Sequence, residues 1–188
     1  MPIARQTLVD AKTIASDPIF AAEQTRLARD ALMALSALYP GFSDWWSNKV
    51  EPGLQDGTRA LLLEWRDDRV AGAAIVKDDG VEKKLCCLRV SPGFENGAGL
   101  GVRLFERAFE VLETTRPGLS VSEENRPAFE RLFRHFGFEW ESDHNGIYRP
   151  LKQESAFNGL ALPEPVSPGE STPGIWTAPT HRAPRATR

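Results

Sequence analysis

The sequence predicts an α/β fold in the element order ααβββαβαββ, with a mixed, largely antiparallel sheet flanked by helices. Three apolar, strand-like runs follow one another between residues 60 and 90, with only short turns between them. An amphipathic helical pattern comes directly after the third run. A second such pattern follows a further short strand. A meander followed by a strand-loop-helix-strand crossover implies a mixed sheet in an α/β domain.

The N-terminal third is predicted to be helical. A helix is expected over Phe20–Leu38, because apolar residues recur there at helical spacing. Pro40 and Gly41 end it. Ser43 can cap a short second helix, and Pro52 marks the loop after it. This region therefore supplies the first two helices.

The three strands are predicted at Ala60–Arg66, Val70–Lys77 and Glu82–Val90. The Asp-Asp-Gly sequence at 78–80 is a strong hairpin signal between two apolar runs. The gap at 67–68 is too short for a parallel crossover. These strands are therefore expected to form an antiparallel meander.

The second half alternates helix and strand. A helix is expected from Ala98 to Thr114, with an apolar stripe opposite charged residues. Leu119–Glu123 is read as a short strand, and Arg126–Phe136 as the last helix. Two short strands, Phe138–Ser142 and Gly146–Arg149, are predicted to form a closing hairpin.

The composition changes near residue 150. From Lys152 onward the chain is rich in proline and small polar residues and lacks periodicity. Such a segment cannot bury enough apolar surface to offset its ordering entropy. We therefore expect one folded domain over residues 1–150 and a disordered, Pro-rich C-terminal tail over residues 151–188.

Net charge and cysteine content restrict the possible partners, metal sites and cellular location of the protein. The formal net charge is −3, and a mildly acidic domain makes nucleic acid an unlikely partner. Cys86 and Cys87 are adjacent, so a disulfide framework or a cysteine zinc site is not expected. No uninterrupted apolar run approaches 18 residues, which argues against a membrane span. We expect a cytoplasmic protein that binds no metal.

The most informative stretch joins the third strand to the next helix. Leu88–Pro92 runs into a glycine-rich turn at Asn96–Gly101, which opens the helix. Glycines let the backbone approach a ligand closely, and the free N–H groups of a helix's first turn favour an anion. Arg103 can add a positive charge, so a pyrophosphate would suit this turn. The ending of a P-loop is missing, and a dinucleotide fingerprint would need glycine at Val102.

Leu88–Pro92 followed by Gly97-x-Gly99-x-Gly101 resembles the acyl-CoA motif of GNAT-superfamily acetyltransferases. The resemblance implies acetyl-CoA as co-substrate and a GNAT-like fold. Asn125, before the last helix, resembles the family's strand-Asn-helix ending and is expected to contact the cofactor. The pyrophosphate is expected on the turn and pantetheine on the strand main chain, with the binding residues Leu88, Arg89, Val90, Asn96, Gly97, Ala98, Gly99, Leu100, Gly101, Arg103 and Asn125.

Two positions depart from the family pattern. Asn96 stands where arginine or glutamine is usual, and it offers no positive charge. Phe133 stands where many members carry a tyrosine that protonates the leaving thiolate. Because phenylalanine cannot donate a proton, a different acid is needed. A non-catalytic acyl-CoA-binding or protein-interaction domain is therefore the alternative function.

The resemblance implies direct transfer of an acetyl or short acyl group to a primary amine in a ternary complex, with backbone N–H groups near Val90 meeting the oxyanion. The amine must lose a proton before it attacks. Glu64 is the first candidate base and Glu82 the second, although solvent-facing carboxylates would explain either. Tyr148 is the leading replacement acid, against a structural role. An acyl-cysteine route and a homodimer stay open, and the amine acceptor cannot be read from the sequence.

Overall fold

The computed structural model describes residues 4–95 and 99–163. Four antiparallel strands form the first sheet in the order β1-β2-β3-β4. A second antiparallel sheet has the order β5-β7-β6. The strands of the first sheet are β1 Ala4–Val9, β2 Arg59–Arg66, β3 Arg69–Asp78 and β4 Lys83–Val90, and those of the second are β5 Leu119–Ser122, β6 Trp140–Asn145 and β7 Gln153–Phe157.

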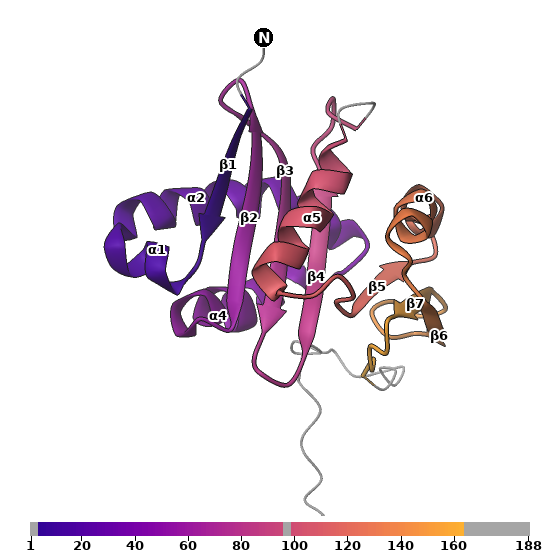
Figure 1. The fold of residues 1–188 in the computed structure, drawn as a ribbon. Coiled ribbons are helices and arrows are strands. Elements are labelled where there is room, and N and C mark those ends of the chain that lie inside the picture. Colours follow the sequence, from indigo (N-terminus) through magenta and orange to yellow (C-terminus); the bar gives the residue numbers. More distant parts are fainter. Residues whose placement is uncertain (1–3, 96–98, 164–188) are drawn as a thin grey trace, which may run out of the picture.

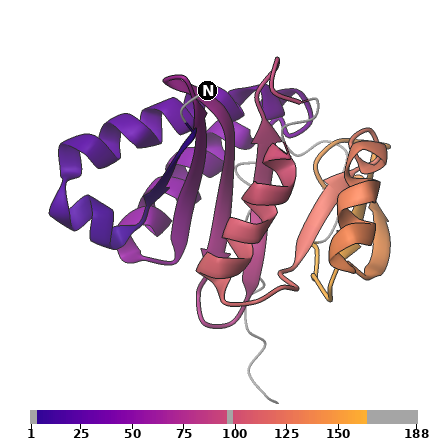
Figure 2. The same ribbon diagram turned by 45° about the horizontal axis from the view of Figure 1, so that its top comes forward.

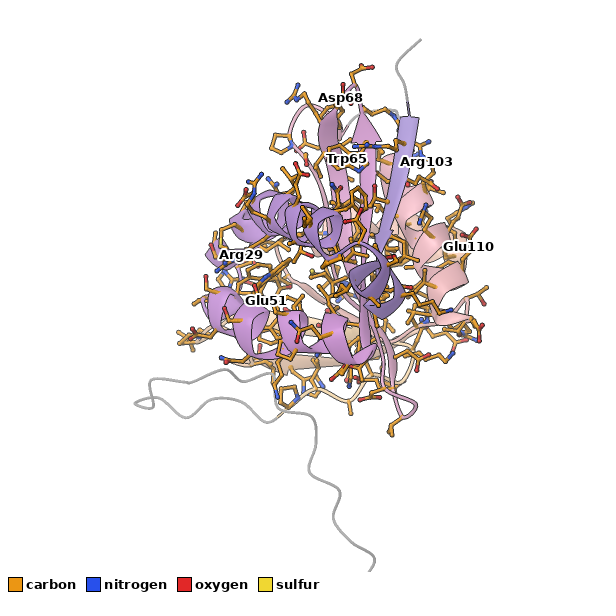
Figure 3. The ribbon with its side chains drawn as sticks, turned by 90° about the vertical axis from the view of Figure 1, so that its left-hand side faces the viewer. Arg29, Glu51, Trp65, Asp68, Arg103 and Glu110 are labelled. Carbon is orange, nitrogen blue, oxygen red and sulfur yellow. The ribbon has the colours of Figure 1, made fainter. Side chains whose placement is uncertain are left out.

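Helices cover both faces of the first sheet (Figures 1 and 3). One face carries a layer made by the N-terminal helices, which continue through a 3-10 turn at residues 33–37 and a π-helical turn at residues 46–50. The other face carries α5, and α6 lies on the second sheet (Figure 2). The helices are α1 Ala11–Ser16, α2 Pro18–Leu32, α3 Phe42–Trp45, α4 Glu51–Asp56, α5 Leu100–Leu112 and α6 Arg126–Phe136.

Two hydrophobic cores follow from the alternation of side chains along the strands. Leu61 and Leu63 of β2 point to the helical layer, where they pack with Trp45 and Trp46. Leu62, between them, points to the opposite face and joins the second core, which includes α5 and the start of the second sheet. The sheet is thus buried on both sides, which explains why β2 reads as a continuous apolar run.

The predicted α/β architecture with largely antiparallel strands flanked by helices is confirmed. The three strands of the meander and the last helix, Arg126–Phe136, lie where the sequence predicted them. The strand β1 was not predicted. Its sequence mixes charged and apolar residues and shows no clear apolar alternation. The polar Thr7 is buried in it, and its hydroxyl accepts a hydrogen bond from Trp65 Nε1 of the neighbouring strand.

The predicted closing hairpin is wrong in register. The chain at 146–149 forms no strand, and β6 instead runs through the predicted turn to Asn145 and pairs with Gln153 of β7. The turn between them is longer, with Gly146 and Leu151 at positive φ. Because β7 lies between β5 and β6, the folded chain extends past the predicted boundary at residue 150. The residues from 164 onward, where a disordered tail is predicted, lie outside the described part.

Candidate active site

The two sheets touch at one end and separate beyond it. The only bridge between β4 and β5 in the described chain joins Lys84 and Gly118 in parallel, where Gly118 N donates to Lys83 O at 2.9 Å and Leu85 N donates to Gly118 O at 3.0 Å. Beyond this point β5 diverges from β4 (Figures 1 and 2). Past the bridge, the edge of β4 therefore has no partner strand among the described residues.

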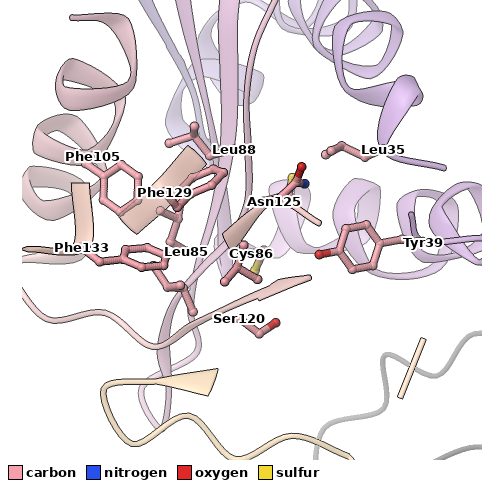
Figure 4. Close-up of a pocket in the computed structure, with 13 residues that line it drawn as sticks. Leu35, Tyr39, Leu85, Cys86, Leu88, Phe105, Ser120, Asn125, Phe129 and Phe133 are labelled. Carbon is pink, nitrogen blue, oxygen red and sulfur yellow. The ribbon is translucent and has the colours of Figure 1, made fainter. Parts of the chain in front are cut away.

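A cleft lies in this divergence (Figure 4). The phenylalanines of α5 and α6 make an apolar wall, and Tyr39 and Ser120 bring hydroxyl groups to the other side. No charged side chain lines the cleft among the described residues. The lining residues are Leu35, Tyr39, Leu85, Cys86, Cys87, Leu88, Phe105, Leu119, Ser120, Val121, Asn125, Phe129 and Phe133.

A β-bulge shapes the floor of the cleft. Cys87 pairs with Ile75 and Leu85 pairs with Val76, so Cys86 is the extra residue on β4. As a result both cysteine side chains pack toward the helical layer, whereas neighbours on a regular strand would point to opposite faces. Both thiols are free. Burial raises the pKa of each thiol, which keeps them protonated and weakly nucleophilic.

The strand residues predicted to bind pantetheine lie along this edge, but their side chains differ in role. Leu88 lines the cleft. Val90 packs against the α5 core. The Arg89 guanidinium donates to the Ala31 carbonyl at 2.7 Å, so this side chain secures the helical layer. A contact with a ligand at Arg89 would have to come from its main chain.

The glycine turn is described in part. Asn96, Gly97 and Ala98 lie outside the described residues. Gly99 has φ +61° and precedes α5, and among the described residues a Cβ placed there would have the Arg103 guanidinium within 4 Å, at 3.7 Å. That this turn binds a ligand stays a prediction.

The remaining predicted residues of the turn serve packing as well. Leu100 is buried in the start of α5. Gly101 lets α5 approach α6, since a Cβ there would meet Leu132 Cδ1 at 3.3 Å. Arg103 Nε lies 3.8 Å from Glu64 Oε2 and thus is paired inside the molecule.

Neither carboxylate predicted as the base lines the cleft. Glu64 is 1% exposed, and its Oε1 accepts a 2.7 Å hydrogen bond from Gln6 Nε2, while Arg66 and Arg103 lie within 4 Å. Glu82 lies beside the β3–β4 turn, where Lys77 Nζ is 2.9 Å from its Oε2. Both groups are engaged in ion pairs.

A third carboxylate, Glu154 of β7, was not predicted from the sequence. It is 4% exposed, and its Oε1 accepts a 3.2 Å hydrogen bond from the Tyr39 hydroxyl, which lines the cleft. Burial raises the pKa of Glu154 to about 7, against hydrogen bonds from Ser120 and Tyr39 and the positive charges of Lys84 and Arg149. A carboxyl group with this pKa can exchange a proton near neutrality. No local pattern marks Glu154, because Tyr39 is 115 residues away in the sequence.

Tyr148, the predicted acid, packs against Tyr39. The two rings meet edge to face with their centroids 5.1 Å apart. Burial raises the pKa of both phenols, followed by the negative charge of Glu154, so both stay protonated at neutral pH. Tyr39 lines the cleft, whereas Tyr148 does not appear in its lining. Tyr39, Tyr148 and Glu154 thus form a polar cluster beside the cleft.

Asn125 and Phe133 occupy the α6 side of the cleft. Asn125 lies at the start of α6, and its side chain makes no capping bond to the helix and lines the cleft (Figure 4). Phe133 packs on Phe157 with ring centroids 4.4 Å apart, within an aromatic cluster. The structure therefore gives Phe133 a packing role where a proton donor would be needed.

Two further findings concern the described residues as a whole. Within residues 4–95 and 99–163, no helix is long and apolar enough to cross a bilayer. Within the same residues, no three or more histidine, cysteine, aspartate or glutamate side chains are grouped so that they could hold a metal ion.

Solved structures resemble this fold. A Desulfovibrio desulfuricans protein described as a GNAT-family acetyltransferase aligns with a TM-score of 0.57 at 18% identity, over 84% of this chain and 97% of that one. A Salmonella typhimurium protein, yncA, described as an acetyltransferase and solved with acetyl-CoA, gives 0.52 at 17% identity, over 88% and 97%. The PaiA N-acetyltransferase of Thermoplasma acidophilum, solved with coenzyme A, gives 0.51 at 12% identity, over 82% and 98%.

The chain therefore has the fold of the GNAT acetyltransferases. No protein-family model matches the chain, and no curated protein sequence matches it.

Proposed function

We propose that this protein is an acyl-CoA-dependent N-acyltransferase that transfers a short acyl group to a primary amine. The observation that carries the proposal is the cleft between β4 and β5, with the buried Tyr39–Glu154 pair beside it. An unpaired strand edge is suited to an extended, amide-bearing ligand, which can add to it as a further strand. Pantetheine has two amide groups and this extended shape.

The residues present fit acyl-CoA. The open edge of β4 offers main-chain groups, Asn125 has an amide without a helix-capping bond, and Gly99 opens α5 in a conformation that leaves space at the turn. The helix N-terminus favours the pyrophosphate. Acyl-CoA would supply an activated thioester carbonyl. Resemblance to proteins solved with acetyl-CoA or CoA supports this choice.

The polar cluster supplies the proton chemistry. Glu154, in its ionised form, can take a proton from the ammonium group of the acceptor. Glu154 does not itself line the cleft, but we assign this role to it in place of Glu64 and Glu82, because it is hydrogen-bonded to Tyr39, which does line the cleft, and its pKa is about 7. Tyr39, protonated and lining the cleft, can donate a proton to the leaving sulfur, with Tyr148 packed against it. The unpaired N–H groups of β4 can stabilise the developing oxyanion.

A thiol-release assay tests the function. The full-length protein is mixed with acetyl-CoA and a panel of primary amines that covers amino acids, polyamines, aminoglycosides and peptides, and free CoA is measured. We expect amine-dependent release of CoA with at least one acceptor class. Saturable binding of acetyl-CoA without release on any amine would favour the non-catalytic alternative. Absence of acetyl-CoA binding would reject both.

A further inference from the structure

The cleft continues into an inner pocket on the side of the helical layer. Five residues line both spaces, namely Leu35, Tyr39, Cys86, Cys87 and Ser120, and the inner pocket adds Phe42 and Trp45 as its far wall. Phe42 and Trp45 are each 1% exposed, so the pocket is blind at this end. A group that enters the inner pocket must therefore come from the cleft.

The position of this pocket relates it to the reacting end of the donor. The pocket opens beside the bulge at Cys86 and Cys87, near the point where β4 and β5 come together. A ligand that follows the open edge of β4 from the glycine turn meets this convergence as it reaches Leu85. Tyr39, the hydrogen-bond partner of Glu154, lines both spaces at the same place.

The chemistry of the walls favours an uncharged, apolar occupant. No charged side chain lines the inner pocket among the described residues. Arg59 is a nearby cation that does not line the pocket, and its guanidinium lies 3.7 Å from Cys86 Sγ and 6.0 Å from the Trp45 ring centroid. Glu154 contacts Tyr39 but does not line the inner pocket, so an ammonium group inside it would lose its hydration without a carboxylate in direct contact, which is costly. An acyl chain carries no charge and would gain from burial.

We propose that this inner pocket receives the acyl chain of the donor and that the protein favours a chain longer than acetyl. The proposal rests on the proposed function, since it concerns the same donor. The pocket has a volume of about 20 Å³, which is room for roughly one water-sized group. Propionyl-CoA is therefore the expected best fit, and a chain of six carbons exceeds the space.

Equilibrium binding tests this without knowledge of the acceptor. Calorimetry on the full-length protein compares CoA, acetyl-CoA, propionyl-CoA, butyryl-CoA and hexanoyl-CoA in the absence of amine. One buried methylene group corresponds to roughly a fourfold gain in affinity, so propionyl-CoA should bind about fourfold more tightly than acetyl-CoA. Hexanoyl-CoA should bind no better than acetyl-CoA.

A pair of matched variants locates the effect. Trp45→Phe enlarges the inner pocket and should move the best-bound chain from propionyl to butyryl. Trp46→Phe is the control, because Trp46 is equally buried in the same segment but does not line the pocket. It should keep the wild-type order of affinities. If melting curves show that Trp45→Phe does not fold, Phe42→Leu, at the same wall, replaces it.

The outcomes separate the two proposals. If no CoA ester binds, the proposed function fails. If CoA esters bind with affinities that do not depend on chain length, or if both tryptophan variants change the order in the same way, the acyl pocket is refuted while the CoA site stands.

Discussion

At the level of single residues, the main feature is that a buried carboxyl group and a phenol share one hydrogen bond beside the cleft. Glu154 lies on β7 and Tyr39 on the segment between α2 and α3, so two distant parts of the chain build the pair. Each group changes the other, since the phenol stabilises the carboxylate and the carboxylate keeps the phenol protonated. The pair can therefore hold a base and an acid at neutral pH.

Glu154→Gln should lower kcat/KM for the best acceptor by roughly 100-fold or more, because general-base catalysis contributes that much. In the wild type, the rate should rise with pH through the pKa of Glu154, about 7, and this limb should be absent in the variant. Glu64→Gln is the comparison. It should destabilise the protein by breaking the ion pair with Arg103, yet keep the pH limb. A limb that persists in Glu154→Gln and disappears in Glu64→Gln would restore Glu64 as the base.

Tyr39→Phe should lower kcat roughly tenfold or more. It should also move the rise of the rate with pH to a higher pH. The first effect reflects the lost proton donor. The second arises because the phenol no longer donates to Glu154 and so no longer lowers its pKa. Tyr148→Phe leaves that hydrogen bond intact and should keep the limb in place. Stopped-flow and steady-state rates between pH 5.5 and 9 measure the loss of kcat and the shift of the pH dependence. A larger loss of kcat in Tyr148→Phe than in Tyr39→Phe would assign the role of acid to Tyr148.

At the level of elements, β4 and α5 together define the donor side of the cleft. The bulge at Cys86 turns two neighbouring side chains to one face, and the main-chain edge beyond it stays open. Gly99 then begins α5 in the left-handed region. The conformation at Gly99 favours glycine, which places no side chain of its own at the start of the helix.

Gly99→Glu should abolish measurable binding of acetyl-CoA. A glutamate would bring a side chain and a negative charge to the expected pyrophosphate position. Gly137→Glu is the matched control, because Gly137 has φ +68°, has no heavy atom within 4 Å of its added Cβ, and ends α6. Both variants should lose about 1 kcal/mol of stability from the strained φ, but only Gly99→Glu should lose binding in calorimetry. Unchanged affinity in Gly99→Glu would exclude the turn from the site.

Elements with a strong apolar period could be predicted from the sequence, and those with mixed composition could not. Arg126–Phe136 was predicted with its observed ends, because its apolar stripe and following glycine are local signals. The strand β7 contains Glu154 and Ser155, whose burial depends on partners elsewhere in the chain. Glu154, the proposed base, could not be predicted for the same reason. The cleft residues Leu88 and Asn125 were found through motifs, whereas Glu154 has no motif.

At the level of the whole molecule, the two sheets are joined at the Lys84–Gly118 bridge and enclose the cleft between two hydrophobic cores. In this arrangement Glu154 is buried in the second sheet, and its carboxyl group is hydrogen-bonded to Tyr39 of the helical layer. A buried carboxyl group with a raised pKa opposes folding when it must ionise. The site therefore carries a cost in stability that depends on pH.

This cost can be measured by comparing how the free energy of unfolding depends on pH in the wild type and in Glu154→Gln. Below pH 4.5 Glu154 is protonated in the folded and the unfolded chain and does not affect the pH dependence. Between pH 4.5 and about 7 only the unfolded chain loses the proton, so the folded state binds more protons and its stability falls as pH rises. The total is about 3 kcal/mol by pH 8, at roughly 1.4 kcal/mol per pH unit. Glu154→Gln lacks this loss.

Urea denaturation at pH 4.5, 6 and 8 should therefore show Glu154→Gln gaining on the wild type as pH rises, with the gain levelling off above pH 7. Ion-paired carboxylates such as Glu124, whose pKa Arg149 lowers to about 2, titrate alike in both proteins and cancel in the difference. If the two free energies of unfolding stay parallel across this range, Glu154 has an ordinary pKa and cannot be the base that titrates near neutrality. The same curves thus test the catalytic assignment before any acceptor is known.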